Sequence, residues 1–427
     1  MTSPLSAKES EQANKQESAK ESLLPLHRQA GFLSFLFSRL AAVFAMQIQA
    51  IVVAWQVYDI TRDPMALAYV GLAQFLPMVL LLLPAGDVVD RFSRKRILQL
   101  SWMVQGVCSA LLLALSWQDS QQVGAFYAVL ALFGAARAFT GPTLQSLLPN
   151  IVPRAQLASA IALNSSIMKV AVIGGPLLGG ILYGLGGGGL AYAACLGCFI
   201  AGLLLLLPVP IHYAEPVKTL ESTAVKRFTA GIRYIRYQPI ILGVISLDLF
   251  AVLLGGVVAL LPIYAQEVLY VGPEGLGALR SAIAVGALLM GLYLGIKGIK
   301  RHAGLIMFLA VATFGIANLV FAFSTIFWLS LVAMLVAGAA DMISVYVRMT
   351  LIQLATPDEM RGRVNAVNML FIGSSNELGE FRAGSMAAWL GAVPAAIIGG
   401  VGTLAVVCAW MKLFPPLRRV DRFDDAR

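Results

Sequence analysis

The sequence predicts an all-α membrane protein of twelve transmembrane helices in two six-helix, pseudo-symmetric bundles. Three observations lead to this: recurrent apolar runs, a shortage of charge and an internal repeat. Only 12% of the 427 residues are charged, whereas a soluble domain carries roughly 25%. An apolar run of about 20 residues spans a hydrocarbon core, and a helix satisfies its own backbone there. Runs such as 79–83 and 203–207 do not alternate apolar and polar residues, which excludes a transmembrane β-barrel.

The apolar runs place the expected helices and divide the chain. The predicted spans are 32–57, 65–84, 97–117, 122–148, 157–183, 190–208, 240–264, 277–296, 303–323, 327–353, 364–389 and 394–413. The expected segments are a disordered cytoplasmic tail (1–30), an N-terminal six-helix bundle (31–208), a cytoplasmic linker (209–239), a C-terminal six-helix bundle (240–414) and a cytoplasmic tail (415–427).

The linker contains a candidate amphipathic helix. Phe228, Ile232 and Ile235 recur at helical spacing, and basic residues lie between them. This pattern favours a helix lying on the inner leaflet of the membrane. A simple cytoplasmic linker is the alternative.

The basic residues are distributed unequally between the two sides of the predicted membrane. The formal charge is +9, which could suggest nucleic-acid binding. However, most of the 31 Lys and Arg residues fall in the two tails and in alternate loops, whereas the opposite loops hold Arg62. That asymmetry follows the positive-inside rule. It predicts a multi-pass protein of the cell inner membrane with both termini in the cytoplasm, and it argues against a nucleic-acid partner.

An internal repeat relates the two halves at a constant offset of 204 residues. Pro153 corresponds to Pro357, and Asn164 corresponds to Asn368. These matches keep one register across a loop, which small apolar residues alone would not establish. Parallel six-helix repeats imply two similar bundles with a binding site at their interface.

Charged residues within the predicted spans are candidates for function. Arg137 and Asp341 occupy the same repeat position, each about halfway along its span. A charge at that depth costs several kcal/mol unless it is paired or hydrated. We therefore expect both to line a central cavity and to compensate each other directly, through water or through substrate. A purely structural ion pair is the alternative.

Three more charges lie near the middle of predicted spans. Lys169 is in the fifth span, and Glu377 and Glu380 are three residues apart in the eleventh. Buried carboxylates can exchange protons near neutral pH, so these residues are candidates for proton coupling. Their alternative role is to hold helices together. Asp248 and Arg348 lie nearer the cytoplasmic side, where they could snorkel or form an inner gate.

The segment 86–96 resembles the signature loop of the major facilitator superfamily, GxLaDrxGrkxxl. The matching residues are Gly86, Asp90, Arg91, Arg94, Lys95 and Leu98. Two positions depart from the pattern: Val88 replaces the usual Leu, and Ser93 replaces the second Gly, which bears on the tightness of the turn. The resemblance implies that this loop gates the cytoplasmic side and that Asp90 locks the outward-open state.

A glycine-rich motif in the fifth span permits close helix packing and a kink. It runs from Gly174 to Gly180 and includes Gly175, Pro176, Gly179 and Gly180. It resembles the GPxxGG end of the major facilitator antiporter motif, although the upstream glycines are missing. The resemblance favours export over import, and plain packing is the alternative.

Residues 30–417 as a whole resemble the bacterial subfamily that includes the enterobactin (siderophore) exporters, most clearly at 58–77, 162–167 and 356–381. The resemblance implies export of a small molecule, in this case a siderophore, by proton antiport with alternating access. A multidrug carrier, another small-molecule efflux carrier or a lipid flippase is the alternative, and a non-transporting receptor or scaffold belongs to another class. The excess of cations over anions in the spans favours an anionic or catecholate cargo.

No catalytic set, cofactor motif or metal-ligand pattern emerges from the sequence. The CxxC of Cys195 and Cys198 has no second ligand pair, and the phosphate-cradling loop of ATP-driven pumps is absent. We therefore expect a monomeric, non-enzymatic protein without cofactor or metal. Its expected partners are a small-molecule substrate, protons and membrane lipids.

Overall fold

The computed structural model of the chain describes residues 25–26, 29, 31–210 and 224–423, and these residues are almost entirely helical. The predicted N-terminal tail lies outside the described residues except at 25, 26 and 29, and the linker lies outside them between 211 and 223. The first five long helices are α2 (Phe32–Thr61), α3 (Pro64–Arg91), α4 (Arg94–Trp117), α5 (Val123–Leu147) and α6 (Leu157–Leu206), and the short 3₁₀ turns η2 (Leu148–Asn150) and η3 (Arg154–Gln156) connect the last two.

The second part of the chain begins with α7 (Ala224–Tyr237). It continues through α8 (Pro239–Gly255), η4 (Val258–Leu260), α9 (Leu261–Ile263), η5 (Tyr264–Val268), α10 (Gly272–Lys297), α11 (Ala303–Phe323), α12 (Phe327–Ala355), α13 (Asp358–Leu390), α14 (Ala392–Leu413) and α15 (Pro415–Arg418). Ten helical segments of the described chain are long and apolar enough to cross a membrane. The chain is therefore an all-helical, multi-pass membrane protein.

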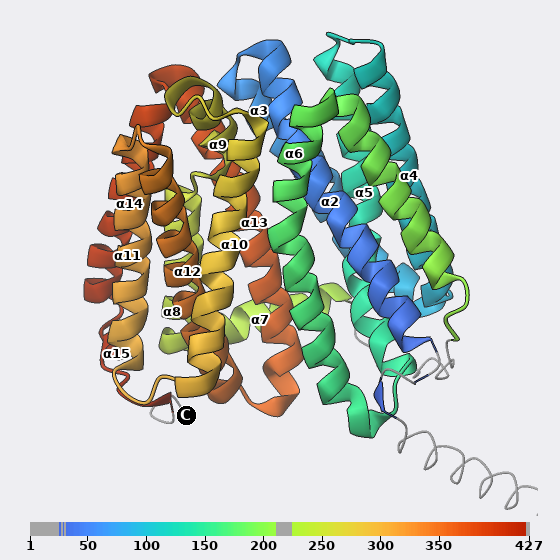
Figure 1. Cartoon of the computed structure of the whole chain (residues 1–427). Coiled ribbons are helices and arrows are strands. Elements are labelled where there is room, and N and C mark those ends of the chain that lie inside the picture. The colour runs from blue at the N-terminus through green and yellow to red at the C-terminus, as the bar shows by residue number, and fades with distance from the viewer. Residues whose placement is uncertain (1–24, 27–28, 30, 211–223, 424–427) are drawn as a thin grey trace, which may run out of the picture.

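Helix α6 contains a break. Gly186 (φ −149°) and Gly187 (φ 63°) depart from helical geometry, and both lie between the predicted spans 157–183 and 190–208. The positive φ at Gly187 is accessible to glycine without steric cost. The chain reverses at this point, so that the two parts of α6 run in opposite directions (Figure 1).

The predicted span 240–264 is not one continuous helix, which corrects the sequence-based expectation. Helix α8 ends at Gly255, and Gly256 is extended (φ −60°, ψ 117°). The side-chain amide of Asn318 on α11 donates to the Gly255 carbonyl at 2.9 Å, which satisfies an acceptor left free by the break. The chain then continues through η4 and α9 to η5, a short π-helix.

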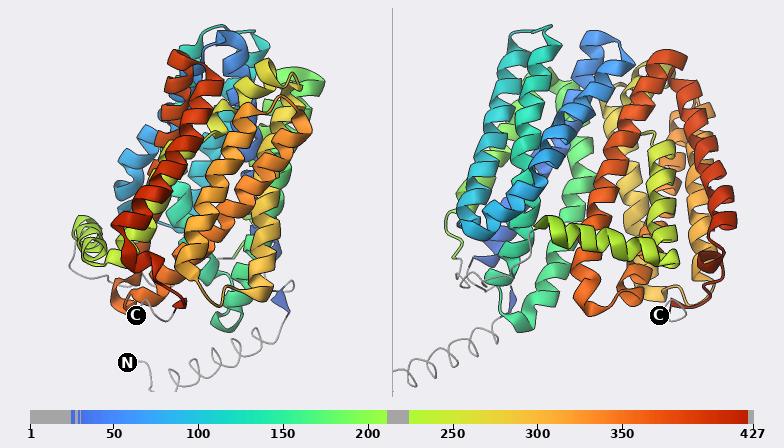
Figure 2. Two further views of the ribbon diagram at one scale, coloured as in Figure 1. Left: turned by 90° about the vertical axis from the view of Figure 1, so that its left-hand side faces the viewer. Right: turned by 180° about the vertical axis from the view of Figure 1, so that it is seen from behind.

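The long helices are aligned along one common axis, alternately up and down, so the molecule has two ends (Figure 1). The Arg62 end, at the top of Figure 1, holds the turn between α2 and α3 and the segment η5. The α7 end, at the bottom, holds α7, α15 and the C-terminal side. Figure 2 shows that α7 lies across the long helices at that end.

Four clusters of buried hydrophobic residues are described. One lies within the helices α2–α6, and two lie within the part from α7 onward. The remaining cluster joins Ile51, Trp55, Tyr58 and Leu67 of α2 and α3 to residues from Val257 onward, such as Leu276 of α10. Most of its members lie toward the Arg62 end, so the apolar contact between the N-terminal and C-terminal helices is concentrated there.

Helix α7 packs its apolar side against the protein. Ile235 is buried in a cluster with Ile352 of α12 and Val367 of α13, and the Tyr234 hydroxyl donates to the Ala355 carbonyl at 3.1 Å. Ile232 remains partly exposed. Much of the apolar face expected to meet the inner leaflet is therefore covered by α12 and α13.

Candidate binding cavity

A cavity of about 510 Å³ lies between the N-terminal and C-terminal helices. Its walls include Gln47 and Ile51 of α2, Phe133 of α5, Pro262 of α9 and Leu276 of α10. Most of the lining is apolar. Because both groups of helices contribute, the cavity would change shape if they moved relative to each other.

Four charged side chains line this cavity: Arg137 on α5, Arg280 on α10, and Glu377 and Glu380 on α13. Arg137, Glu377 and Glu380 were singled out from the sequence. Arg280 lies within the predicted span 277–296, but no sequence pattern assigned it a role. The proximity of Arg280 to the glutamates of α13 follows only from the fold, in which α10 and α13 face the same cavity.

The four charges act on one another electrostatically without forming closed ion pairs. Glu377 lies within electrostatic range of Glu380, Arg137 and Arg280. Within the described part of the chain, none of the four makes a salt bridge. Arg137 is exposed to the cavity, and the other three are partly exposed. Charges in this condition remain available to a bound molecule or to water.

Asp341 and Lys169 lie apart from the main cavity. Asp341 on α12 lines a separate cavity of about 10 Å³ together with Asp248 and Ser344, about the space of one water molecule. Lys169 on α6 is within electrostatic range of Asp341. The structure thus places Asp341 near Lys169 and Arg137 near Glu377, whereas the sequence led us to expect that Arg137 and Asp341 compensate each other. The repeat predicts how deep in the membrane a residue lies, but its neighbours depend on which helices pack against it.

Asp248 and Arg348 form an ion pair between α8 and α12. Both side chains are buried. Since both helices belong to the C-terminal group, this pair stabilises that group internally and does not bridge the cavity. Neither snorkelling nor an inner gate describes it.

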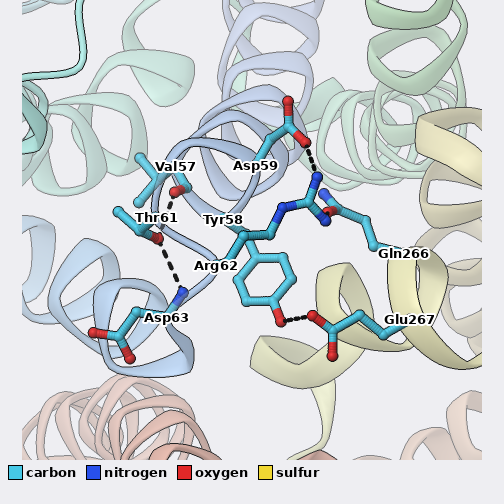
Figure 3. Close-up of polar contacts among 8 residues, drawn as sticks. All are labelled: Val57, Tyr58, Asp59, Thr61, Arg62, Asp63, Gln266 and Glu267. Carbon is cyan, nitrogen blue, oxygen red and sulfur yellow. Dashed lines mark hydrogen bonds and ion pairs between the residues drawn. The ribbon is translucent and has the colours of Figure 1, made fainter.

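At the Arg62 end, polar contacts join the end of α2 to η5 (Figure 3). The Tyr58 hydroxyl donates to a carboxylate oxygen of Glu267. The Arg62 guanidinium donates to Oε1 of Gln266 at 2.6 Å and pairs with Asp59 at 2.6 Å. Tyr58 and Arg62 thus bridge the N-terminal helices to the C-terminal ones. These contacts were not predicted from the sequence because Gln266 and Glu267 lie beyond the predicted span 240–264, in η5.

The glycine motif of α6 lies at a seam with two other helices. A methyl group at Gly175 would lie 2.5 Å from Cβ of Gln47 on α2, and one at Gly179 would lie 3.1 Å from Cα of Ile48. A methyl group at Gly180 would overlap the carbonyl oxygen of Pro273 on α10.

The seam is also formed from the α10 side. A methyl group at Gly277 would lie 2.5 Å from the carbonyl oxygen of Pro176. The Ser281 hydroxyl donates to the Ile173 carbonyl at 2.6 Å. The motif therefore brings α6 backbone to backbone with α10, across the two groups of helices.

The segment 86–96 forms the end of α3, a two-residue turn and the start of α4 at the α7 end. Lys95 donates to the carbonyls of Leu207 and Val209, each at 2.8 Å, and Arg94 donates to the Ser146 carbonyl at 3.4 Å. Cations at helix C-termini satisfy free carbonyls and oppose the helix dipole. These two side chains tie α4 to the ends of α6 and α5.

The remaining positions of this segment take less part in described contacts. Ser93 has φ −59°, so the turn does not require the glycine of the family pattern. A methyl group at Gly86 would meet no atom within 4 Å, so no described helix requires a glycine at this position. Arg91 is exposed at the end of α3, and the side chain of Asp90 lies outside the described part of the structure.

A membrane protein built from many long helices around a charged central cavity has the architecture of a transporter. Comparison with known proteins agrees. The family model described as "Transmembrane secretion effector", from the major facilitator superfamily, matches residues 21–426. The chain belongs to this family.

Curated relatives cover nearly the same length. The enterobactin exporter of Citrobacter koseri is 25% identical over 406 residues, covering 93% of this chain and 94% of the relative. The enterobactin exporter of Salmonella choleraesuis is 26% identical over 404 residues, covering 93% and 95%. The resemblance to this transporter subfamily is thus confirmed.

Solved structures share the fold at lower identity. A mutant of the nucleoside transporter NupG aligns with a TM-score of 0.73 and 11% identity, covering 90% of this chain and all of that one. A bacterial homologue of the iron transporter ferroportin in an inward-facing state aligns with a TM-score of 0.68 and 19% identity, covering 91% and 99%. Since the matched family consists of transporters, the prediction that the chain is not an enzyme is confirmed.

Proposed function

We propose that this protein is a secondary active transporter that exports an organic small molecule from the cytoplasm in exchange for protons. The observation that carries the proposal is the cavity of about 510 Å³, whose carboxylates and guanidinium groups come from both groups of helices. Such charges are costly at membrane depth unless they serve a substrate or a coupling ion.

The proposed architecture has two bundles of six spans. Helix α6 counts as two spans because of its break at Gly186 and Gly187, and α13 counts as one despite its charges. With α2–α5 and α8, α10–α12 and α14, this makes twelve. The apolar clusters confined to each group of helices support the division, and the offset of 204 residues supports an axis along the membrane normal.

We place the protein in the inner membrane of the cell. In the proposed orientation, the α7 end faces the cytoplasm. The basic residues support this, because Arg91, Arg94 and Lys95 and the C-terminal segment lie at the α7 end. Contacts between the two groups of helices near the Arg62 end support a cavity closed on that side, so the conformation described would be the inward-facing one. The tails at 1–30 and 415–427 would then be cytoplasmic, and the chain would act as a monomer.

A siderophore is the proposed cargo, and a drug is the competing one. Support for the siderophore comes from the enterobactin exporters among the relatives. Cells with and without the protein would be loaded with labelled siderophore or with a small drug panel, with and without a protonophore. We expect protonophore-sensitive efflux of the siderophore, and we expect Arg137→Ala to lose it at unchanged protein level.

Other results of this experiment would redirect the proposal. Efflux of drugs alone would move the chain to the multidrug carriers. If no labelled compound left faster, or if the protonophore had no effect on efflux, export by proton exchange of these cargoes would be rejected.

A further inference from the structure

The charge balance of the cavity constrains the chemistry of its substrate. Within the described chain, its lining holds two cations, Arg137 and Arg280, and two carboxylates, Glu377 and Glu380. The glutamates are three residues apart, which places them on one face of α13. With all four ionised, the lining is neutral, so a simple anion gains no net attraction from it.

Glu377 is the carboxylate whose surroundings are best defined. The charged groups that face it are Glu380 on its own helix, Arg137 on α5 and Arg280 on α10. Helix α3 presents Gly71, whose Cβ position would lie 3.7 Å from Oε2 of Glu377, and Gln74 lines the same cavity. A ligand that reaches Glu377 therefore also meets guanidinium groups.

Exchange of substrate for protons requires that substrate binding and protonation of the cavity carboxylates oppose each other. An anion held by the arginines alone would bind more tightly when Glu377 is protonated, because protonation removes a repelling negative charge. By reciprocity, such an anion would also promote protonation, and the two would travel in the same direction. Exchange instead needs a substrate that binds the ionised carboxylate, that is, one that donates hydrogen bonds to it.

On the basis of the proposed function, we propose that the cavity selects molecules that carry an acidic group beside hydrogen-bond donors. The acidic group binds Arg280 and Arg137, the donors bind Glu377 and Glu380, and Arg280 determines specificity for the acid. When such a molecule binds, a protonated carboxyl group of Glu377 or Glu380 loses its proton to the water of the cavity and becomes the acceptor. A volume of about 510 Å³ is within the range of small-molecule sites, and Ile51, Phe133 and Leu276 supply apolar contacts for the body of the ligand.

Three matched probes distinguish recognition of the acidic group by the arginines from recognition of the hydrogen-bond donors by the glutamates. They are 2,3-dihydroxybenzoate, which has a carboxylate and phenolic donors, benzoate, which lacks the donors, and catechol, which lacks the acid. Each would be titrated into the purified full chain in lipid nanodiscs by calorimetry. Buffers of different ionisation enthalpy would give the number of protons exchanged at each pH.

We expect 2,3-dihydroxybenzoate to bind at least about tenfold more tightly than either single-function probe, since tenfold corresponds to one additional interaction of about 1.4 kcal/mol. Its binding should release protons. Glu377→Gln should reduce that release, and Arg280→Gln should weaken the two acids while leaving catechol unchanged. Arg280→Lys should restore part of the affinity, and Arg382→Gln, on α13 but outside the cavity lining, is the control for loss of a charge within a span.

Several outcomes would overturn this inference. They are proton uptake on binding, equal affinity for benzoate and 2,3-dihydroxybenzoate, no effect of Arg280→Gln, or no binding of 2,3-dihydroxybenzoate. If efflux from cells remained protonophore-sensitive in those cases, the substrate class would be wrong and the proposed function would stand. If 2,3-dihydroxybenzoate released protons but no compound were exported, export would be rejected and the substrate class retained.

Discussion

The two ends of the molecule are held together in different ways. At the Arg62 end, contacts join the N-terminal helices to the C-terminal helices, through Tyr58 and Glu267, Arg62 and Gln266, and the seam of α6 with α10. At the α7 end, the polar contacts that the structure describes for Lys95 and Tyr234 stay within one group of helices. Lys95 binds the end of α6, and Tyr234 binds the end of α12.

This difference identifies which contacts must break for the cavity to open on its other side. Across the two groups near the α7 end, the hydrogen bond described is the weak contact between Gln145 and the sulfur of Met369 at 3.9 Å. Opening the Arg62 end would break the apolar cluster shared by the two groups of helices, the hydrogen bonds of Tyr58 and Arg62, and the backbone contact between α6 and α10. New contacts at the α7 end must compensate for that loss in the outward-facing state.

The largest expected effect is at the glycine seam. Gly180→Ala places a methyl group against the carbonyl oxygen of Pro273, and overpacking of this kind costs about 1–3 kcal/mol. We expect transport to fall about tenfold or more while the protein still inserts, measured as efflux per molecule of transporter. Gly197→Ala, on the same helix with no atom within 4 Å of the new methyl group, is the control, and equal activity of the two variants would contradict the role of the seam.

The next effect concerns the hydrogen bond between Tyr58 and Glu267. Tyr58→Phe removes a bond worth about 1 kcal/mol, so the population open at the Arg62 end should rise about fivefold. The measurement is the rate at which a membrane-impermeant maleimide labels Ala54→Cys, in the cavity lining, from that side in a chain without its four native cysteines. Tyr270→Phe is the control because Tyr270 is exposed, and unchanged labelling in Tyr58→Phe would show that this bond does not hold the end closed.

A smaller effect is expected at the α7 end. Lys95→Met removes two hydrogen bonds to the end of α6, and cations at helix C-termini contribute about 0.3–1 kcal/mol. We expect the unfolding temperature to fall by a few degrees, while labelling of Ala54→Cys from the Arg62 side stays the same. Arg96→Met, at an exposed neighbouring position, should leave both unchanged. Altered labelling in Lys95→Met would mean that this contact also takes part in gating.

The smallest effect is at the C-terminal segment. The His302 backbone N–H and the Arg301 side chain bind Asp421 and hold its pKa below the ordinary value. The contribution of Asp421 is therefore complete above the unfolded value of about 3.9 and is lost as the pH falls through the lower folded value.

Hydrogen exchange tests this small effect. Asp421→Asn should accelerate exchange at the amides of Ala303 and Gly304, which donate to the carbonyls of Asp421 and Val420. The difference from the unaltered protein should disappear in strong acid. Asp119→Asn, in an exposed turn, is the control, and a difference that persisted at low pH would exclude the carboxylate as its cause.

The sequence predicted the helices well because apolar length is a local property. The runs from α2 to α5 and from α10 to α14 match the predicted spans apart from their ends. The break after Gly255 was missed because it depends on Asn318 from another helix. No apolar periodicity records such a partner.

The candidate site was only partly accessible from the sequence. Arg137, Glu377 and Glu380 could be selected from the sequence because a charged residue within an apolar span is rare. The structure places all three in the lining of one cavity. Asp341 was equally conspicuous but faces a different cavity. The contact between Tyr58 and Glu267 depends on the π-helix that follows the break, so its two partners could not be associated before the fold was known.

The seam between α6 and α10 also restricts the kind of movement that is possible. Gly180 faces Pro273 and Gly277 faces Pro176 with no room for a side chain on either surface. Sliding α10 along α6 by one turn would bring Pro273 or Ser281, four residues away, into the place of Gly277. Such a shift meets a steric resistance that separation of the two helices does not, which favours a hinge over a shear movement.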